Sequence, residues 1–259
     1  LLSSVGIFSD DKKLIILCTG VRQEILLNPE KLMKLGFFDS GLGGKLVMED
    51  FKRFYPDIEM ILFMDREHAP YGGKTGEEIR SLTKRGVDTL FAEGAHVVIL
   101  ACNTASVHAL RWLQQEIYPE KHILGVTVPG AEAVVEGKYK KIGVLATEAT
   151  VRSRMYKERV HILDDTVIVE EIAAPGLVPL IEKGMIDGPE IEILLEEYLS
   201  QFSPDIEALV LGCTHYPLIE DAISKVWLRL FSRKLVMIDP GKEAALKMER
   251  WLVHHYSSF

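Results

Sequence analysis

Two segments of the chain repeat one pattern, and this repeat restricts the possible folds more than any other feature. In each segment an apolar run ends in a small residue, then a cysteine, then polar residues: VVILACNTAS at 97–106 and ALVLGCTHYP at 208–217. A short, almost wholly apolar run is typical of a strand buried on both faces of a parallel sheet. Because ligands bind at the carboxyl ends of such strands, we expect Cys102 and Cys213 at ligand-binding edges.

A second pair of segments repeats at nearly the same spacing. KLGFFDSG at 34–41 and KIGVLATE at 141–148 each lead through a lysine and a glycine to a turn that carries a hydroxyl, Ser40 or Thr147. The offset between these segments is 107 residues, and the offset between the two cysteines is 111 residues. One such match is common in any α/β protein, but two with similar offsets predict two similarly folded halves.

From residue 34 onward, strand-like runs alternate with helical periodicity. In 42–54 and in 189–202 the apolar residues recur on one helical face. This alternation predicts an α/β fold in which helices cover both faces of parallel sheets. Strands are predicted at 34–38, 59–64, 95–101, 122–127, 141–146, 166–172, 206–212 and 234–238.

Residues 1–32 differ from this pattern. The apolar run LIILC at 14–18 is too short for the core of a signal peptide, and Met33 directly precedes the first predicted strand. We therefore interpret 1–32 as a leader or an extension of unknown role, and we assign no chemistry to Cys18. The predicted domains are 33–126 plus 240–259, which carries Cys102, and 127–239, which carries Cys213, with a tight crossing near VTVPG at 126–130.

Charge and cysteine content exclude several classes of protein. The net charge of −8 over 259 residues argues against a nucleic-acid-binding surface, which requires clustered lysine and arginine. Three cysteines without paired spacing favour reduced thiols in the cytoplasm over a disulfide framework. No apolar run approaches the roughly 18 residues that a membrane helix needs. We expect a cytoplasmic protein with a small-molecule substrate and with neither nucleic acid nor membrane as partner.

Two glycine-rich turns follow predicted strands. In DSGLGG at 39–44 the glycines leave backbone N–H groups available for a carboxylate or phosphate, although the GxGxxG spacing of a dinucleotide site is absent. The alternative is a simple helix start with Asp39 or Ser40 as N-cap. PYGG at 70–73 predicts a turn, in which Tyr71 could also offer its hydroxyl to a ligand.

The two cysteine loops suggest proton transfer. A free cysteine is often only a small buried apolar residue, but each thiol here precedes a predicted helix start, which lowers a thiol pKa. His215 lies two residues beyond Cys213, so a strand-like path would place both on one side. Cys102, Cys213, His68 and His215 could ligate zinc, but the absence of a CxxC or HxxxH pair argues against a metal.

Four motifs in this order, DSGLGG, PYGG, ACNTAS at 101–106 and GCTHYPL at 212–218, resemble the glutamate racemase family over residues 33 to about 250. The resemblance implies two α/β domains related by pseudo-twofold symmetry, with the active site in the cleft between them. It also implies cofactor-independent interconversion of L- and D-glutamate, supply of D-glutamate for bacterial peptidoglycan, and a homodimer. IDPG at 238–241 departs from the serine-glycine pattern of many relatives.

By the same resemblance, Cys102 and Cys213 are the two catalytic bases, one on each face of the substrate α-carbon. Asp39 assists the first thiol, and His215 and Glu182 assist the second. The implied substrate-binding residues are Asp39, Ser40, Tyr71, Gly72, Asn103, Thr104, Thr147, Thr150, Thr214 and His215, with the choice between Thr147 and Thr150 left open.

Two alternative functions remain open on the sequence. An aspartate racemase, or another racemase of the superfamily, would share the two cysteines. A non-catalytic two-lobed amino-acid-binding protein would use the same cleft, but binding alone does not require paired thiols at strand ends.

Overall fold

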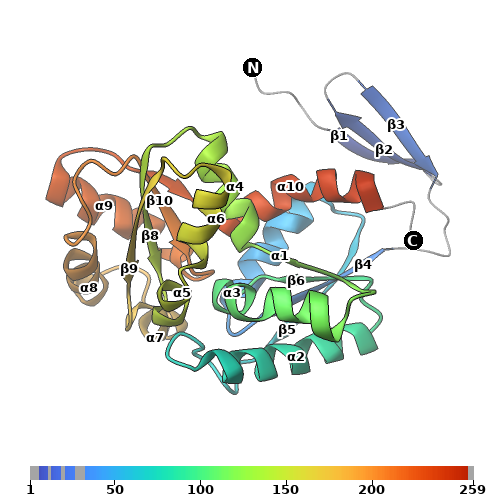
Figure 1. Ribbon diagram of the computed structural model, residues 1–259, viewed down its shortest axis with the longest axis horizontal. Helices are drawn as coiled ribbons and strands as arrows, with labels where there is room; N and C mark the ends of the chain where they lie inside the picture. Colours follow the sequence, from blue (N-terminus) through green and yellow to red (C-terminus); the bar gives the residue numbers. More distant parts are fainter. Residues whose placement is uncertain (1–5, 11–12, 19–20, 27–32, 256–259) are drawn as a thin grey trace.

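The computed structural model describes residues 6–10, 13–18, 21–26 and 33–255, and within these ranges the chain forms three separate sheets (Figure 1). The sequence pattern predicts no strand before residue 34. The first sheet is nevertheless antiparallel and pairs only internally, through β1 (Gly6–Asp10), β2 (Lys13–Cys18) and β3 (Val21–Leu26). The interpretation of 1–32 as a leader or extension stays a prediction.

The other two sheets have four parallel strands each, and their strand orders are the same. One sheet has the order β5-β4-β6-β7, with β4 (Lys34–Asp39), β5 (Glu59–Met64), β6 (Val97–Leu100) and β7 (His122–Gly125). The other has the order β9-β8-β10-β11, with β8 (Lys141–Ala146), β9 (Ile168–Ala173), β10 (Ala208–Gly212) and β11 (Val236–Ile238). Strands β4 and β8 therefore correspond, as do β6 and β10, which confirms the predicted α/β fold with two similar halves.

The eight predicted strands all correspond to observed ones, with small shifts at their ends. Strands β5 and β8 begin and end at the predicted residues. Strand β6 covers only four of the seven residues predicted at 95–101, although Ala95 and Ala101 are buried beyond its ends. Apolar runs report burial, and burial extends past the residues that pair in the ladder.

Helices cover both faces of each parallel sheet because successive strand residues point to opposite faces. In the first half, Phe37 packs toward α1 (Gly43–Phe54) and α10 (Pro240–His255), whereas Phe38 packs toward α2 (Gly76–Ala92) and α3 (Asn103–Trp112). In the second half, Val144 lies with α4 (Thr127–Glu136) and α6 (Met155–Leu163), and Leu145 lies with α8 (Pro189–Leu199) and α9 (Glu220–Phe231). The shorter helices are α5 (Glu148–Ser153), α7 (Leu177–Glu182), the π-helix η1 (Leu113–Ile117) and the 3-10 helix η2 (Tyr216–Ile219).

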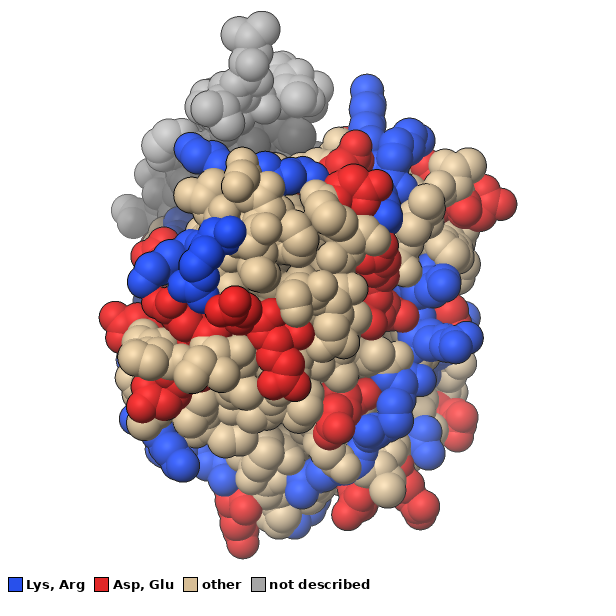
Figure 2. All heavy atoms as spheres, turned by 90° about the vertical axis from the view of Figure 1, so that its left-hand side faces the viewer, with Lys and Arg blue, Asp and Glu red and all other residues tan. Residues whose placement is uncertain are grey.

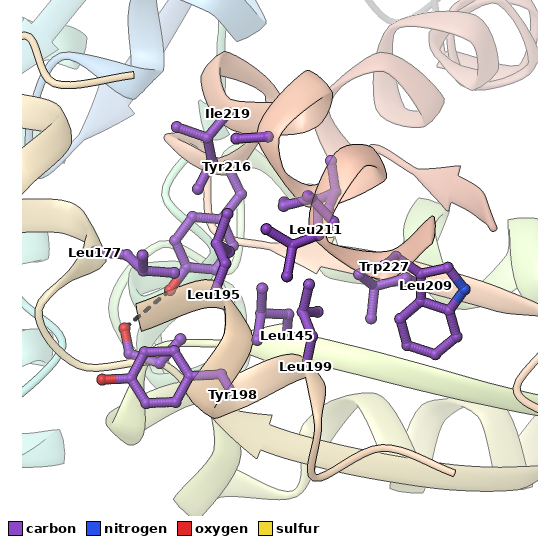
Figure 3. Packing of buried hydrophobic residues seen from close by; sticks show 14 of the residues in the cluster. Leu145, Leu177, Leu195, Tyr198, Leu199, Leu209, Leu211, Tyr216, Ile219 and Trp227 are labelled. Carbon is purple, nitrogen blue, oxygen red and sulfur yellow. Dashed lines mark hydrogen bonds between the residues drawn. The ribbon is translucent and has the colours of Figure 1, made fainter. Parts of the chain in front are cut away.

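The apolar layer under α8 and α9 supports the strand end that carries Cys213. Figure 3 shows Leu209 and Leu211 of β10 beside Trp227 of α9, with Tyr216 of η2 at the end of the strand. Trp227 and Tyr216 are fully buried, and the Tyr216 hydroxyl donates to the carbonyl of Ala174 over 3.3 Å. Burial of a side chain of this size stabilises the folded state by about 2–3 kcal/mol, so Trp227 and Tyr216 hold this strand end firmly in place.

Helix α10 connects the two halves at the carboxyl end of the chain. It packs on α1 of the first half and on α4 of the second (Figure 1). The domain limits of 126 and 240 stay predictions, since α10 contacts both sides of the boundary. Within the described residues, no helix combines the length and the apolar character that crossing a membrane requires.

On the face shown in Figure 2, basic and acidic side chains are interspersed. Between α8 and α9, Glu192 pairs with Lys225 at 2.6 Å and with Arg229 at 2.7 Å, and Glu196 pairs with Arg229 at 3.0 Å. In the described part of this face, Lys225 and Arg229 therefore lie beside acidic side chains and form no separate basic patch.

Candidate active site

A cavity of about 240 Å³ lies between the two halves, and both cysteines line it. Both cysteines and most of its other polar groups come from the residues just past β4, β6, β8 and β10. In each sheet these are the two neighbouring strands at which the strand order reverses, the position where open α/β sheets bind ligands. The lining residues are Ser40, Gly41, Ala69, Pro70, Tyr71, Gly72, Gly73, Cys102, Asn103, Thr104, Thr147, Glu148, Ala174, Pro175, Gly176, Val178, Pro179, Glu182, Cys213, Thr214 and His215.

Cys102 forms the N-cap of α3. Its sulfur accepts a hydrogen bond from the backbone N–H of Ala105 over 3.4 Å and lies 3.3 Å from the Ser40 hydroxyl oxygen. The expected lowering of the Cys102 thiol pKa is wrong. Burial, together with the nearby Asp39 carboxylate, raises the pKa of Cys102 to about 12, although the hydrogen bonds of Ser40 and Ala105 oppose this rise.

Cys213 occupies the corresponding position in the second half, after β10. Burial raises the pKa of its thiol well above the ordinary range. Its sulfur lies 3.6 Å from Nδ1 of His215, so the expected proximity is present. The expected strand-like path is wrong, because His215 has a helical backbone and is the N-cap of η2. A tight turn, rather than an extended segment, returns the imidazole to the thiol.

Cys213, His215 and Glu182 form a row of three side chains in contact. Glu182 stands at its far end. Its Oε1 lies 2.5 Å from Nε2 of His215 and also accepts the backbone N–H of Leu42 over 2.9 Å. Burial alone would raise the pKa of Glu182, but the bonds from Leu42 and His215 lower it below its usual value. An ionised carboxylate can only accept, so His215 donates from Nε2 and its Nδ1 remains available to Cys213 when the ring is neutral. A β-carbon on Gly41 would lie 2.4 Å from Glu182 Oε1, so a larger residue there would displace this carboxylate.

Asp39 lies behind the cavity wall. It is fully buried, and its carboxylate accepts the N–H of Gly41 over 2.8 Å and the hydroxyl of Thr214 over 3.1 Å. Burial raises the pKa of Asp39 to about 6, against the opposing effect of His215. The alternative of Asp39 or Ser40 as N-cap of α1 is wrong: the N-cap is Leu42, whose own N–H is bound by Glu182.

Three threonines form one hydroxyl cluster across the cavity. Thr104 Oγ1 lies 2.9 Å from Thr147 Oγ1 and 3.3 Å from Thr150 Oγ1, and Thr147 donates to Thr150 over 3.0 Å. Thr104 and Thr147 line the cavity, whereas Thr150 lies behind them and is fully buried. Beside this cluster, Asn103 accepts the hydroxyl of Tyr156 through Oδ1 over 2.5 Å.

Tyr71 and Gly72 belong to one wall of the cavity. The Tyr71 hydroxyl donates to Oδ2 of Asp65 over 2.6 Å, so its proton points away from the cavity. Burial and this bond raise the pKa of Tyr71, which keeps the phenol neutral. A β-carbon on Gly72 would lie 3.0 Å from Cβ of Thr147, so this glycine permits the close approach of the two halves.

An apolar wall and one carboxylate of the cavity were not predicted from the sequence. The segment 174–179 follows β9 and supplies alanine, prolines and valine, and Glu148 follows Thr147. The sequence offered one signal for this wall: the segment after β9 corresponds to the segment after β5 that begins with Asp65. The residues at 174–179 have no polar side chain, so the pattern of polar residues at strand ends did not identify them. The IDPG segment at 238–241 does not line the cavity; its Asp239 accepts the N–H of Gly241 over 2.8 Å at the start of α10.

Among the residues that the structure describes, neither lysine nor arginine lines the cavity. A bound carboxylate would therefore be held by hydroxyls, amides and backbone N–H groups. His68 lies outside the cavity, 2.7 Å from Asp65 through its Nδ1. Among the side chains that the structure describes, no three histidine, cysteine, aspartate or glutamate residues are grouped so as to hold a metal ion.

Comparison with known proteins identifies a family. The family model described as Asp/Glu/Hydantoin racemase matches residues 55–248. The glutamate racemase of Desulforudis audaxviator is 38% identical over 209 residues, which cover 80% of this chain and 74% of that protein. The glutamate racemase of Aquifex aeolicus is 38% identical over 219 residues, which cover 84% of this chain and 82% of that protein. A solved structure of glutamate racemase from Francisella tularensis in complex with D-glutamate has a TM-score of 0.79 and 30% identity, covering 87% of this chain and 82% of that one.

Proposed function

Because the chain belongs to the Asp/Glu/Hydantoin racemase family, we propose that it is a glutamate racemase, interconverting L- and D-glutamate by proton transfer at the α-carbon. One observation carries this proposal. Cys102 and Cys213 follow corresponding strands of two sheets with the same order, and both line one cavity. An amino acid bound there would have a thiol available on each face of its α-carbon.

In the proposed reaction one sulfur enters as a thiolate and the other as a thiol. The thiolate takes the α-proton, so an S–H bond forms while the Cα–H bond breaks. The electron pair of the broken Cα–H bond stays on the substrate as a carbanion conjugated with the carboxylate. The second thiol then donates its proton to the opposite face of the α-carbon. No electron is gained or lost overall, and the two cysteines exchange protonation states. We propose that this step needs no cofactor.

Formation of the thiolate is coupled to substrate binding in this scheme. Burial raises the pKa of Cys102 to about 12 and that of Cys213 well above its ordinary range, so both are thiols near neutral pH. An α-ammonium group placed between them would supply the opposite charge that favours a thiolate. His215, 3.6 Å from Cys213 and oriented by Glu182, is the group that accepts the Cys213 proton.

The remaining polar groups bind and orient the substrate. Negative charge that develops on the substrate carboxylate needs preorganised hydrogen-bond donors, and the cavity offers hydroxyls and amides for this. Asp39 acts from behind the wall through Thr214 and through its charge near Cys102. The residues proposed to contact glutamate are Ser40, Tyr71, Gly72, Asn103, Thr104, Thr147, Thr214 and His215.

The wider setting of the reaction is also part of the proposal. D-glutamate produced here would serve peptidoglycan synthesis in the cytoplasm, and the enzyme would act as a homodimer. Reduced thiols are essential to the two-base scheme, and a reducing compartment maintains them.

Deuterium uptake tests the reaction directly. In heavy water, without added cofactor, L-glutamate should lose optical rotation and gain deuterium at the α-carbon, and D-glutamate should do the same. L-aspartate in the same assay separates this activity from that of an aspartate racemase. Cys102→Ala and Cys213→Ala should each abolish turnover in both directions, and normal racemisation by either variant would refute the two-thiol scheme.

A further inference from the structure

A buried carboxylate outside the cavity contacts one of the cavity walls from behind. Asp65 directly follows β5 and is 4% exposed. Its Oδ2 accepts the hydroxyl of Tyr71 over 2.6 Å, and its Oδ1 lies 2.7 Å from Nδ1 of His68 and 3.9 Å from the guanidinium of Arg85. Short hydrogen bonds to a carboxylate are about twice as strong as those between neutral groups, so Asp65 fixes the Tyr71 side chain.

The wall that Tyr71 belongs to is adjacent to Cys102. Residues 69–73 all line the cavity. The Tyr71 ring is buried in the same apolar cluster as Phe38 and Cys102, and its centroid lies 6.2 Å from that of Phe38. A displacement of this ring would therefore change the shape of the cavity beside the first thiol.

The other side of this wall is held by the second half of the molecule. The Gly72 carbonyl accepts the backbone N–H of Ala149 over 2.9 Å, and Arg152 donates to the Lys74 carbonyl over 3.1 Å. These bonds fix the path of the backbone but leave the direction of the Tyr71 side chain to its own contacts. The bond to Asp65 sets that direction from the first half.

We propose that Asp65 is a positioning residue, a role that rests on the racemase function proposed above. It acts through Tyr71: the carboxylate holds the phenol outward, and the ring and the backbone of 70–73 then form a fixed wall for the substrate beside Cys102. Preorganisation of a binding wall lowers the cost of ordering it when the ligand binds. Loss of the bond should therefore weaken substrate binding more than it slows proton transfer.

The test uses Asp65→Asn, Tyr71→Phe and the double variant in the full-length protein. Each single variant should raise KM for glutamate about tenfold, with kcat within threefold of the wild type. Tyr71→Phe removes this bond, and Asp65→Asn weakens it by replacing a charged acceptor with a neutral amide. Because both changes act on the same bond, the double variant should show a KM no more than about threefold above that of either single variant. A general structural defect would not produce this non-additivity.

Asp88→Asn is the matched control. The Tyr118 hydroxyl donates to Asp88 on α2, so this variant breaks another tyrosine–carboxylate bond, and neither residue lines the cavity. Its KM should stay within twofold of the wild type. Should Asp65→Asn fail to fold, as judged by circular dichroism, Tyr71→Phe tests the same bond from its other end.

Three results would overturn the role of Asp65: an unchanged KM in Asp65→Asn or in Tyr71→Phe, multiplicative effects in the double variant, or an equal rise in KM in Asp88→Asn. The wild type is assayed first. Absence of glutamate turnover there would overturn the proposed function and this role together, whereas normal wild-type turnover with an unchanged KM in the variants rejects Asp65 alone.

Discussion

Glu182, the last residue of α7, accepts a hydrogen bond from the backbone N–H of Leu42, which lies at the start of α1 in the other half of the molecule. The two atoms are 2.9 Å apart, and the same carboxylate oxygen lies 2.5 Å from Nε2 of His215. One oxygen therefore joins the first half to the imidazole beside Cys213. Opening of the cleft between the halves would break the bond between Leu42 and Glu182, and Glu182 is the residue that orients His215.

Glu182→Gln should impair proton transfer at Cys213. Glutamine is nearly the same size, but it removes the negative charge that stabilises a protonated imidazole. We expect kcat for glutamate to fall by about 10²-fold with KM within threefold, since general acid–base groups typically contribute 10²–10⁴-fold. Steady-state racemisation followed by circular dichroism measures both constants. A kcat within threefold of the wild type would contradict the role assigned to the Glu182 and His215 pair.

Asp39→Asn should change how stability depends on pH. Burial raises the folded-state pKa of Asp39 to about 6, above its unfolded value, so the folded state binds the proton more tightly. Stability therefore decreases as pH rises from about 4 to about 6, where Asp39 ionises. In the variant this loss is absent, and its free energy of unfolding relative to the wild type should increase by about 1 kcal/mol between pH 5 and pH 7.

Urea unfolding at both pH values measures this difference. Asp239→Asn is a useful comparison, because burial also raises the pKa of Asp239 to about 6 at a position that does not line the cavity. The free energy of unfolding of Asp239→Asn relative to the wild type should also increase between pH 5 and pH 7, with glutamate turnover retained. A relative stability of Asp39→Asn that stays constant across this pH range would show that Asp39 does not titrate there.

Thr147→Val and Thr150→Val should differ in their effects on substrate binding. Thr147 lines the cavity, whereas Thr150 lies behind it and reaches the cavity only through its bonds to Thr147 and Thr104. Losing a direct hydrogen bond to a charged ligand costs about 1.5–3 kcal/mol, so Thr147→Val should raise KM by about tenfold or more. The rise for Thr150→Val should stay below threefold. A larger rise in KM for Thr150→Val than for Thr147→Val would show that Thr150, rather than Thr147, contacts the substrate.

Local patterns determined the elements and the strand ends that carry the chemistry. Apolar runs at 59–64 and 141–146 predicted β5 and β8 to the residue, and the two repeated offsets predicted two similarly folded halves. Such predictions succeed because strand and helix periodicity, and the position of a strand's carboxyl end, depend on neighbouring residues. The motifs likewise identified the glutamate racemase resemblance before any contact was known.

Tertiary structure decided which of these groups meet and how they ionise. Asp65 and Tyr71 are close in sequence, but their bond depends on how the loop returns to β5; Glu182 and Leu42 lie 140 residues apart. The helix start at Cys102 predicted a lowered thiol pKa, yet burial between the two halves raises it. Desolvation and contacts across a cleft depend on the packing of distant segments, which no local pattern in the sequence encodes.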